Sequence, residues 1–158
     1  MSLPLRWLAV ASSGGHWVQL RRLQPAWSDG EVVYVTTNAT AASEVAGAAL
    51  RFHHVPDASR RRPLALLGQV VRMVAIVARE RPDVVISTGA SIGLIALLAG
   101  KLVGARTIWV DSIANADELS LSGRRARHCA DLWLTQWPHL AFSKPAERRF
   151  PRYEGSVL

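Results

Sequence analysis

Short apolar runs alternate along this chain with segments in which apolar residues recur every three or four positions. Most of the runs end in glycine or polar residues, and their length and composition are typical of strands in a buried sheet. The pattern predicts six strands, at Arg6–Ala11, Val32–Thr36, Leu50–Val55, Val84–Ser87, Thr107–Val110 and Leu132–Thr135. The run at Leu50–Val55 is a weaker strand pattern than the rest.

The segments between these runs have the periodicity of helices. The predicted helices are His16–Trp27, Ala39–Ala46, Pro63–Glu80, Ser91–Val103 and Asp117–Arg127. In the first of them we expect four side chains to face inward: Val18, Leu20, Leu23 and Trp27. In the fourth, a stripe of small residues predicts close packing of the helix on the sheet: Gly93, Ala96 and Gly100.

Strands that alternate with helices over short connections predict parallel strands joined by right-handed crossovers. We therefore expect an α/β fold with a doubly wound parallel sheet of about six strands. A chain of 158 residues has the size of one domain. We assign residues 1–137 to this domain and residues 138–158, which hold three prolines, to an extended C-terminal tail.

The composition is that of a globular protein with a basic surface. Hydrophobic residues make up 49% of the chain and charged residues 20%. Disordered chains contain fewer hydrophobic residues, so this composition indicates a folded protein. The net charge of +7 comes mainly from arginine, since Lys101 and Lys144 are the only lysines. A surface of this kind suits nucleic acid, anionic lipid or a phosphorylated ligand. The single cysteine, Cys129, excludes an internal disulfide.

The predicted helix Pro63–Glu80 is apolar around most of its circumference. Its polar stripe is narrow and runs through Gln69, Arg72 and Arg79. The apolar stretch Leu64–Ala78 is shorter than the roughly 20 residues that span a bilayer. We expect this region to contact an anionic membrane surface, although a buried core helix beside solvated charge fits the same pattern. The basic residues assigned to this surface are Arg60, Arg61, Arg62 and Arg72.

Three polar segments follow predicted strands, so we expect them at the carboxyl edge of the sheet, where such folds bind ligands. They are Ser12–His16, Ser87–Ser91 and Asp111–Asn115. Gly14 and Gly15 allow a tight turn and expose amides at a helix start, where anions are favoured, while a plain tight turn is the alternative. The candidates for binding a pyrophosphate or sugar hydroxyls are Ser13, Gly14, Gly15, Thr88, Gly89, Ser91 and Asn115.

Two titratable residues in these segments are candidate catalytic groups. His16 opens the first predicted helix, where a neutral imidazole could act as a general base. Asp111 ends the fifth predicted strand, and its carboxylate could accept hydrogen bonds from sugar hydroxyls or deprotonate one. A capping histidine and a turn aspartate are the structural alternatives. For Ser91 the alternative is a helix N-cap.

These motifs resemble one family of glycosyltransferase subunits. The resemblance includes the three polar segments and continues through Leu119–Gly123 and Ala130–Pro138. The family contains the membrane-associated subunit of the two-component UDP-GlcNAc transferase of N-glycan assembly, and its bacterial exopolysaccharide counterparts. The resemblance covers nearly the whole chain and is most specific in Leu119–Gly123 and Ala130–Pro138.

The resemblance implies a Rossmann-like domain, the N-terminal half of a GT-B fold, that binds a polyprenyl-pyrophosphate-linked saccharide. A partner subunit equivalent to the C-terminal half would hold the UDP-sugar, and the transfer would invert the sugar without a metal or other cofactor. His16 matches the family's glycine-histidine motif and is the better candidate base, whereas Asp111 stands where relatives often carry Glu. The end of the chain resembles the segment that packs on the partner, which assigns partner contacts to Tyr153, Gly155, Val157 and Leu158.

The eukaryotic relatives carry a membrane-spanning segment before the first strand, and this sequence shows none. We therefore expect a peripheral protein at the cytoplasmic face of the inner membrane, acting in exopolysaccharide or capsule assembly. Two alternatives remain. One is a non-catalytic anchor that recruits the donor-binding subunit to the membrane. The other, a basic nucleotide- or nucleic-acid-binding domain, would need aromatic side chains beside the arginines, whereas Trp17 and Trp27 fall on a helix pattern; we expect no nucleic-acid partner.

Overall fold

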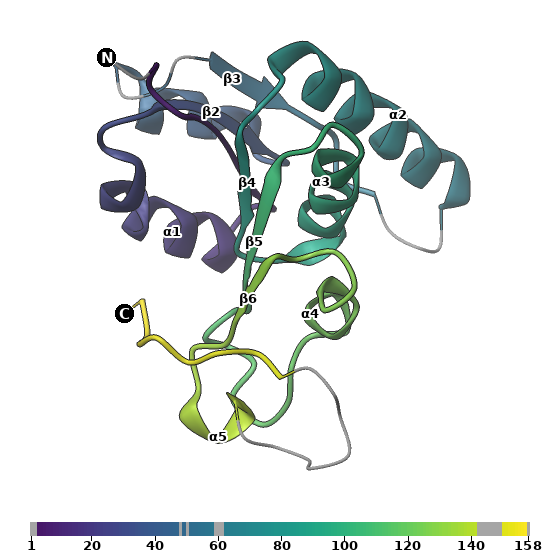
Figure 1. The fold of residues 1–158 in the computed structure, drawn as a ribbon. Coiled ribbons are helices and arrows are strands. Elements are labelled where there is room, and N and C mark those ends of the chain that lie inside the picture. Colours follow the sequence, from purple (N-terminus) through teal and green to yellow (C-terminus); the bar gives the residue numbers. More distant parts are fainter. Residues whose placement is uncertain (1–2, 48, 50, 59–61, 142–149, 158) are drawn as a thin grey trace.

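A six-stranded parallel sheet forms the centre of the computed structural model, which describes residues 3–47, 49, 51–58, 62–141 and 150–157 (Figure 1). The strands are β1 (Arg6–Ala11), β2 (Glu31–Thr36), β3 (Arg51–His54), β4 (Val84–Ser87), β5 (Arg106–Val110) and β6 (Leu132–Leu134). They lie in the order β3-β2-β1-β4-β5-β6, and all neighbours are parallel. The predicted doubly wound α/β fold is confirmed.

Helices cover both faces of the sheet (Figure 1). They are α1 (Gly15–Arg22), the 3-10 helices η1 (Gln24–Trp27) and η2 (Ala39–Val45), and the α-helices α2 (Pro63–Glu80), α3 (Ala90–Leu102), α4 (Leu121–Ala126) and α5 (Pro138–Ala141). Successive β1 residues belong to different cores: Leu8 packs with α2 and α3, and Ala9 with α1 and η2. This alternation follows from the two-residue period of a strand and explains why the central strands are apolar on both faces.

The first predicted helix is divided in the structure. The α-helix ends at Arg22 and a 3-10 turn follows, because Pro25 has no N–H with which to continue the α-helical hydrogen bonds. Trp17 and Leu20 are buried, whereas Val18 is 49% exposed, so the expected inward position of Val18 is wrong.

Three further segments differ from their predictions. Ala39–Val45 is a 3-10 helix rather than an α-helix. The fifth predicted helix begins only at Leu121, because the Ser120 hydroxyl accepts a hydrogen bond from Gly123 N and caps the helix there. The tail starts with the helical turn Pro138–Ala141 instead of extended chain, and Arg152 later forms a parallel bridge with Leu134 at the edge of β6.

The small residues of α3 allow the helix to lie directly on the sheet, as predicted. A Cβ at Gly93 would overlap the Ser87 hydroxyl, and one at Gly100 would lie 2.7 Å from Val85 Cγ2. α3 follows β4 directly, so the helix starts at the carboxyl end of β4, where the second polar segment lies.

The C-terminal end of α2 is held to β3 by a buried carboxylate. Glu80 is completely buried and accepts hydrogen bonds from Arg51 Nε, at 2.9 and 2.8 Å, and from His53 Nε2 at 2.9 Å. Burial alone raises the pKa of Glu80, but the bonds from Arg51 and His53 outweigh it and hold this pKa below its ordinary value. The orientation of α2 on the sheet is therefore fixed at this end.

Candidate functional site

The first and second polar segments meet at the centre of the sheet. The chain leaves β1 to form α1 on one face, and leaves the neighbouring β4 to form α3 on the other (Figure 1). Ligands of doubly wound sheets bind at this reversal of strand order. The helix that starts at Gly15 and the helix that starts at Ala90 therefore both begin at the edge where a ligand is expected.

His16 is fixed by the loop that follows β4. Its Nδ1 lies 2.9 Å from the Thr88 carbonyl oxygen, and the Thr88 hydroxyl donates to the His16 carbonyl at 2.7 Å. A carbonyl oxygen can only accept, so Nδ1 carries the hydrogen. In the neutral ring Nε2 is then the unprotonated nitrogen, which is the form that a general base requires.

Gly89 makes room for this histidine. A Cβ at Gly89 would overlap the His16 ring, and its φ of +149° also favours glycine. Ala90 follows with a φ of +66°, an uncommon value for a residue with a side chain. Backbone strain of this kind concentrates at functional sites because the surrounding structure must hold it in place.

The residues expected to bind a pyrophosphate divide into two groups. Ser13, Gly14 and Gly15 are exposed, and neither α1 nor α3 has a side-chain cap, although the Ser13 amide donates to the Thr37 hydroxyl at 2.9 Å. Thr88 is completely buried and its hydroxyl is bonded to His16, so it positions the histidine instead of presenting a hydroxyl to a ligand.

The structure places Ser91 inside α3 and not at the N-cap of this helix. Gly89 is the N-cap residue, so the N-cap alternative for Ser91 is wrong. Ser91 lies in the first turn of α3 and is half-buried. Together with Gly14 and Gly15, this turn leaves a polar surface at the two helix starts.

Asp111 does not have the environment of an accessible base. It is 1% exposed. Its Oδ1 accepts from Trp109 Nε1 at 3.1 Å and from the Ser120 hydroxyl at 2.6 Å. Its Oδ2 accepts from Ser120 N at 2.9 Å and from Asn115 Nδ2 at 3.2 Å. The expected catalytic role of Asp111 conflicts with this burial, and Asn115 likewise has its amide directed to Asp111: both hold the loop 112–120 in shape.

Two glutamines, which the sequence analysis did not single out, connect this loop to α1. Gln19 is buried in α1, one turn after His16, and donates to the Ser112 hydroxyl at 3.1 Å. Its Oε1 accepts from Ile113 N at 3.2 Å. Gln19 is not among the inward positions predicted for this helix, so the local pattern carried no signal for it; its burial is visible only in the structure, where its amide has several partners.

The second of these glutamines, Gln136, connects the loop to the C-terminal tail. Its Nε2 donates to Gln19 Oε1 at 2.7 Å and to the Asp111 carbonyl at 2.9 Å. Its Oε1 accepts from Val157 N at 2.7 Å. Of the residues expected to contact a partner, Val157 is therefore attached to the domain itself, Tyr153 and Gly155 are exposed, and Leu158 lies outside the described residues.

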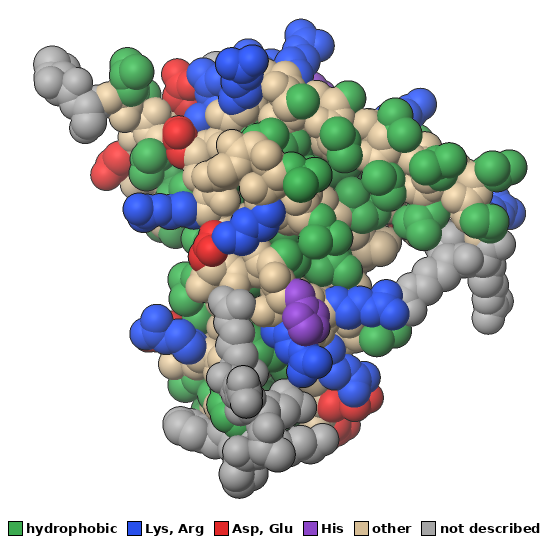
Figure 2. Space-filling view, turned by 45° about the vertical axis from the view of Figure 1, so that its right-hand side comes forward, with side chains coloured by type: hydrophobic (Ala, Val, Ile, Leu, Met, Phe, Trp, Pro, Cys, Tyr) green, Lys and Arg blue, Asp and Glu red, His purple; other side chains and the backbone are tan. Residues whose placement is uncertain are grey.

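The surface predicted to contact a membrane lies on α2, and exposed apolar residues of the neighbouring α3 extend it; we call the two together the α2–α3 face. Hydrophobic side chains gather over α2, with basic side chains at the borders (Figure 2). Its exposed members are Leu64, Leu67, Val71 and Val74 of α2 and Leu98 and Leu102 of α3. The polar stripe is narrower than predicted, because Gln69 is buried and donates to the Pro56 carbonyl at 3.0 Å.

The basic residues assigned to this face are only partly described. Arg62 and Arg72 are exposed, whereas Arg60 and Arg61 lie outside the described residues. None of the described helices is both long and apolar enough to cross a membrane. Within the described ranges, no three His, Cys, Asp or Glu side chains come together as a metal site.

Comparison with known sequences gives relatives along nearly the whole chain. The UDP-N-acetylglucosamine transferase subunit ALG14 of Mus musculus is 28% identical over 172 residues, which cover 89% of this chain and 79% of the relative. The subunit of the same name from Homo sapiens is 27% identical over 168 residues, covering 87% and 78%.

Solved structures share the fold at low sequence identity. The MurG structure from Acinetobacter baumannii matches with a TM-score of 0.70 and 14% identity, over 85% of this chain and 42% of that one. A UDP-N-acetylglucosamine 2-epimerase from Rickettsia bellii matches with a TM-score of 0.63 and 14% identity, over 86% and 40%. This chain thus spans less than half of each solved protein, and likeness at this identity establishes the fold alone.

The glycosyl transferase 4-like domain model matches residues 14–158, which include both helix starts, the loop 112–120 and the tail. The chain belongs to the glycosyl transferase 4-like domain family, as a glycosyltransferase subunit with a GT-B type of fold.

Proposed function

We propose that this chain is the acceptor-binding subunit of a two-subunit enzyme that moves a sugar from a UDP-sugar to a polyprenyl-pyrophosphate-linked saccharide. The observation that carries the proposal is His16, held with Nε2 unprotonated between two helix starts that lack side-chain caps. Assembly of a bacterial exopolysaccharide or capsule is the setting that we assign to the reaction.

His16 would act on the acceptor hydroxyl. Nε2 accepts the proton as the hydroxyl oxygen attacks the anomeric carbon, the new C–O bond forms, and the bond from that carbon to UDP breaks. Attack from the side opposite to UDP inverts the sugar. The resulting imidazolium keeps its Nδ1–H bond to the Thr88 carbonyl, whose partial negative charge stabilises the new positive charge.

The acceptor pyrophosphate would lie at the starts of α1 and α3. Free amides and the positive end of a helix dipole favour an anion there by about 0.3–1 kcal/mol per helix before specific hydrogen bonds are counted. Ser13, Gly14, Gly15 and Ser91 supply this surface. Thr88 and Gly89 act indirectly, because they position His16.

A second subunit would supply the UDP-sugar. The full-length relatives are named as subunits of a UDP-N-acetylglucosamine transferase, and this chain aligns with most of their length. We assign contacts with the second subunit to the tail, residues 138–158, through Tyr153, Gly155, Val157 and Leu158. The exposed Tyr153 ring and the apolar end of the chain suit a protein contact.

The decisive measurement is reconstitution with a separately purified donor-binding subunit. We expect no transfer from a UDP-sugar to a polyprenyl-pyrophosphate saccharide with this chain alone, and transfer with the pair. The donor set should include UDP-N-acetylglucosamine, UDP-glucose and UDP-glucuronate. Transfer by the purified chain alone would contradict the two-subunit proposal.

The α2–α3 face would hold the subunit on the cytoplasmic face of the inner membrane. We expect the double variant Leu64→Ser and Leu67→Ser to bind phosphatidylglycerol vesicles at least about tenfold more weakly in sedimentation, since each buried leucine contributes about 1.5–3 kcal/mol. Both residues are exposed, so the fold should not be affected.

The matched control is Val18→Ser, which removes a similarly exposed apolar side chain from α1 on the other side of the sheet. It should bind vesicles as the unmodified chain does. Neutral phosphatidylcholine vesicles should bind more weakly than anionic ones because of Arg62 and Arg72. If the double variant and the control bound phosphatidylglycerol vesicles equally well, the proposed membrane contact of the α2–α3 face would be refuted.

A non-catalytic recruiting subunit is the second candidate. The burial of Asp111 favours it, because only one of the two candidate catalytic residues can reach an acceptor. In that case the pair would retain transfer after replacement of His16 and lose it after truncation of the tail.

A further inference from the structure

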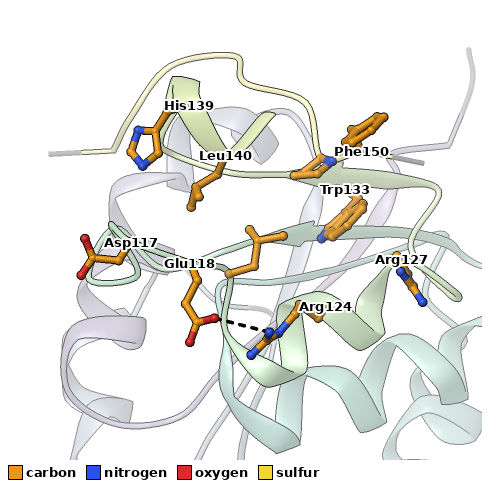
Figure 3. A pocket seen from close by; sticks show the side chains of 10 residues that line it. Asp117, Glu118, Arg124, Arg127, Trp133, His139, Leu140 and Phe150 are labelled. Carbon is orange, nitrogen blue, oxygen red and sulfur yellow. Dashed lines mark ion pairs between the residues drawn. The ribbon is translucent and has the colours of Figure 1, made fainter. Parts of the chain in front are cut away.

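A cavity of about 300 Å³ lies beside the loop 112–120, between α4, α5 and the segment Phe150–Pro151 (Figure 3). Its volume is at the small end of the range of ~300–1,000 Å³ that is usual for ligand sites. One side of the loop is bonded to α1 through Gln19, and the residues 117–119 of the same loop line the cavity. The cavity and His16 are therefore connected through a single loop at the carboxyl edge of the sheet.

Trp133 of β6 gives the cavity an unpaired donor. The residue is 4% exposed, and its Nε1–H has no hydrogen-bond acceptor among the residues that the structure describes. Figure 3 shows the nitrogen-bearing edge of the ring turned toward the space enclosed by the labelled side chains. Buried donors are rarely left unpaired, and an unmade bond of this kind points to a missing group.

The bordering side chains can make way for such a group. Glu118 and Arg124 form an ion pair at 3.4 Å across the edge of the cavity (Figure 3). Their side chains are 73% and 53% exposed, so both can rearrange without disturbing the core.

The mixture of donors, acceptors and apolar surfaces identifies the class of ligand. The cavity is lined by both signs of charge, the carboxylates of Asp117 and Glu118 and the guanidinium groups of Arg124 and Arg127, so its net charge favours neither an anion nor a cation. An apolar ligand would leave the Trp133 N–H and the charged groups unpaired. A neutral ring bearing several hydroxyls can donate to the Glu118 carboxylate, accept from Arg124 and the indole, and place its C–H faces on Leu140 and Phe150.

We infer that this cavity binds a sugar ring of the saccharide acceptor, at a distance from the hydroxyl that reacts. The inference rests on the proposed function for its choice of the acceptor over the donor. It assigns Trp133, Glu118 and Arg124 to saccharide recognition, a role separate from the proton transfer assigned to His16. Sugar binding here would let the enzyme distinguish its acceptor from other polyprenyl-pyrophosphate lipids.

The indole resonance of Trp133 provides the test. The full chain, labelled with ¹⁵N, is titrated with glucose, galactose and N-acetylglucosamine, up to saturation of the shift or the solubility limit. We expect at least one sugar to move the Trp133 indole N–H signal downfield, because a bound hydroxyl supplies the missing acceptor. The signal is identified by its loss in Trp133→Phe, and the other tryptophan signals should stay in place.

Two variants measure the contribution of the site. Trp133→Phe removes the N–H together with the five-membered ring and keeps one aromatic ring, and should weaken sugar binding in saturation-transfer measurements at least about fivefold, the usual effect of losing one neutral hydrogen bond. Trp7→Phe is the matched control on β1 and should leave binding unchanged. Glu118→Gln, at an exposed position, provides a second test if Trp133→Phe does not fold.

Three results would overturn the inference. The first is that no sugar shifts the Trp133 signal of the folded chain. The second is that inorganic pyrophosphate shifts it more than any sugar, which would indicate an anion site. The third is that UDP-N-acetylglucosamine shifts it while free sugars do not, which would assign the cavity to the donor. The titrations need neither the second subunit nor turnover. Sugar binding without transfer by the reconstituted pair would therefore refute the proposed function and leave the cavity assignment intact.

Discussion

His16→Ala is expected to lower kcat of the reconstituted pair by about 10²–10⁴-fold, the usual contribution of a general base. Nε2 is the atom placed to accept the hydroxyl proton, because Nδ1–H is bonded to the Thr88 carbonyl. The saccharide acceptor should still bind, since the helix-start amides are unchanged, so KM should change much less than kcat. Steady-state transfer with the acceptor varied at saturating UDP-sugar separates the two constants.

His16→Asn makes this test sharper, because the amide N–H₂ of asparagine can still donate to the Thr88 carbonyl while no basic nitrogen remains. We expect a similar loss of kcat with little loss of stability. His54→Ala, at an exposed position on the edge strand β3, is the matched control and should retain full activity. Wild-type kcat in His16→Asn would refute the role as base and favour the recruiting subunit.

Asp111→Ala is expected to lower the free energy of unfolding by about 3 kcal/mol or more, because it leaves several buried donors without their charged acceptor. The donors are Trp109 Nε1, Ser120 N, the Ser120 hydroxyl and Asn115 Nδ2. For a chain of this size the loss corresponds to a decrease of about 6–12 °C in Tm. Thermal unfolding followed by circular dichroism measures it.

Asp117→Ala is the control from the same loop. Its side chain is exposed, and it should unfold within about 0.5 kcal/mol of the unmodified chain. Activity provides the second readout for Asp111→Ala: we expect any loss of transfer to follow the loss of the ordered loop 112–120. An Asp111→Ala chain of normal stability but without transfer would instead show that Asp111 acts in the reaction.

The regular elements were largely predictable because they depend on local periodicity. Strands formed at all six expected places, within one residue at each end, and even the weaker pattern Leu50–Val55 gave the strand Arg51–His54. The errors lie where one residue competes with the pattern: Pro25 divides the first helix, and Ser120 delays the start of α4. Such interruptions are hard to weigh against periodicity without the packing around them.

The candidate site was predicted in outline and changed in its details. The three polar segments do lie at the carboxyl edge of the sheet, which follows from parallel strands alone. What each residue does there was not predictable. Thr88 and Asp111 are buried, Gln19 and Gln136 connect the loop to α1 and the tail, and Gln69 is turned away from solvent.

The sequence by itself determined the α/β class, the strands and helices, and the glycine and hydroxyl-rich turns at the ends of the strands. These features depend on residues close together in the chain, whose spacing is sufficient to indicate them. Only the tertiary structure decided which polar side chains are exposed at this edge of the sheet and which are buried and hold the fold. That outcome depends on partners distant in sequence: the Thr88 carbonyl that sets the tautomer of His16 is 72 residues away from it.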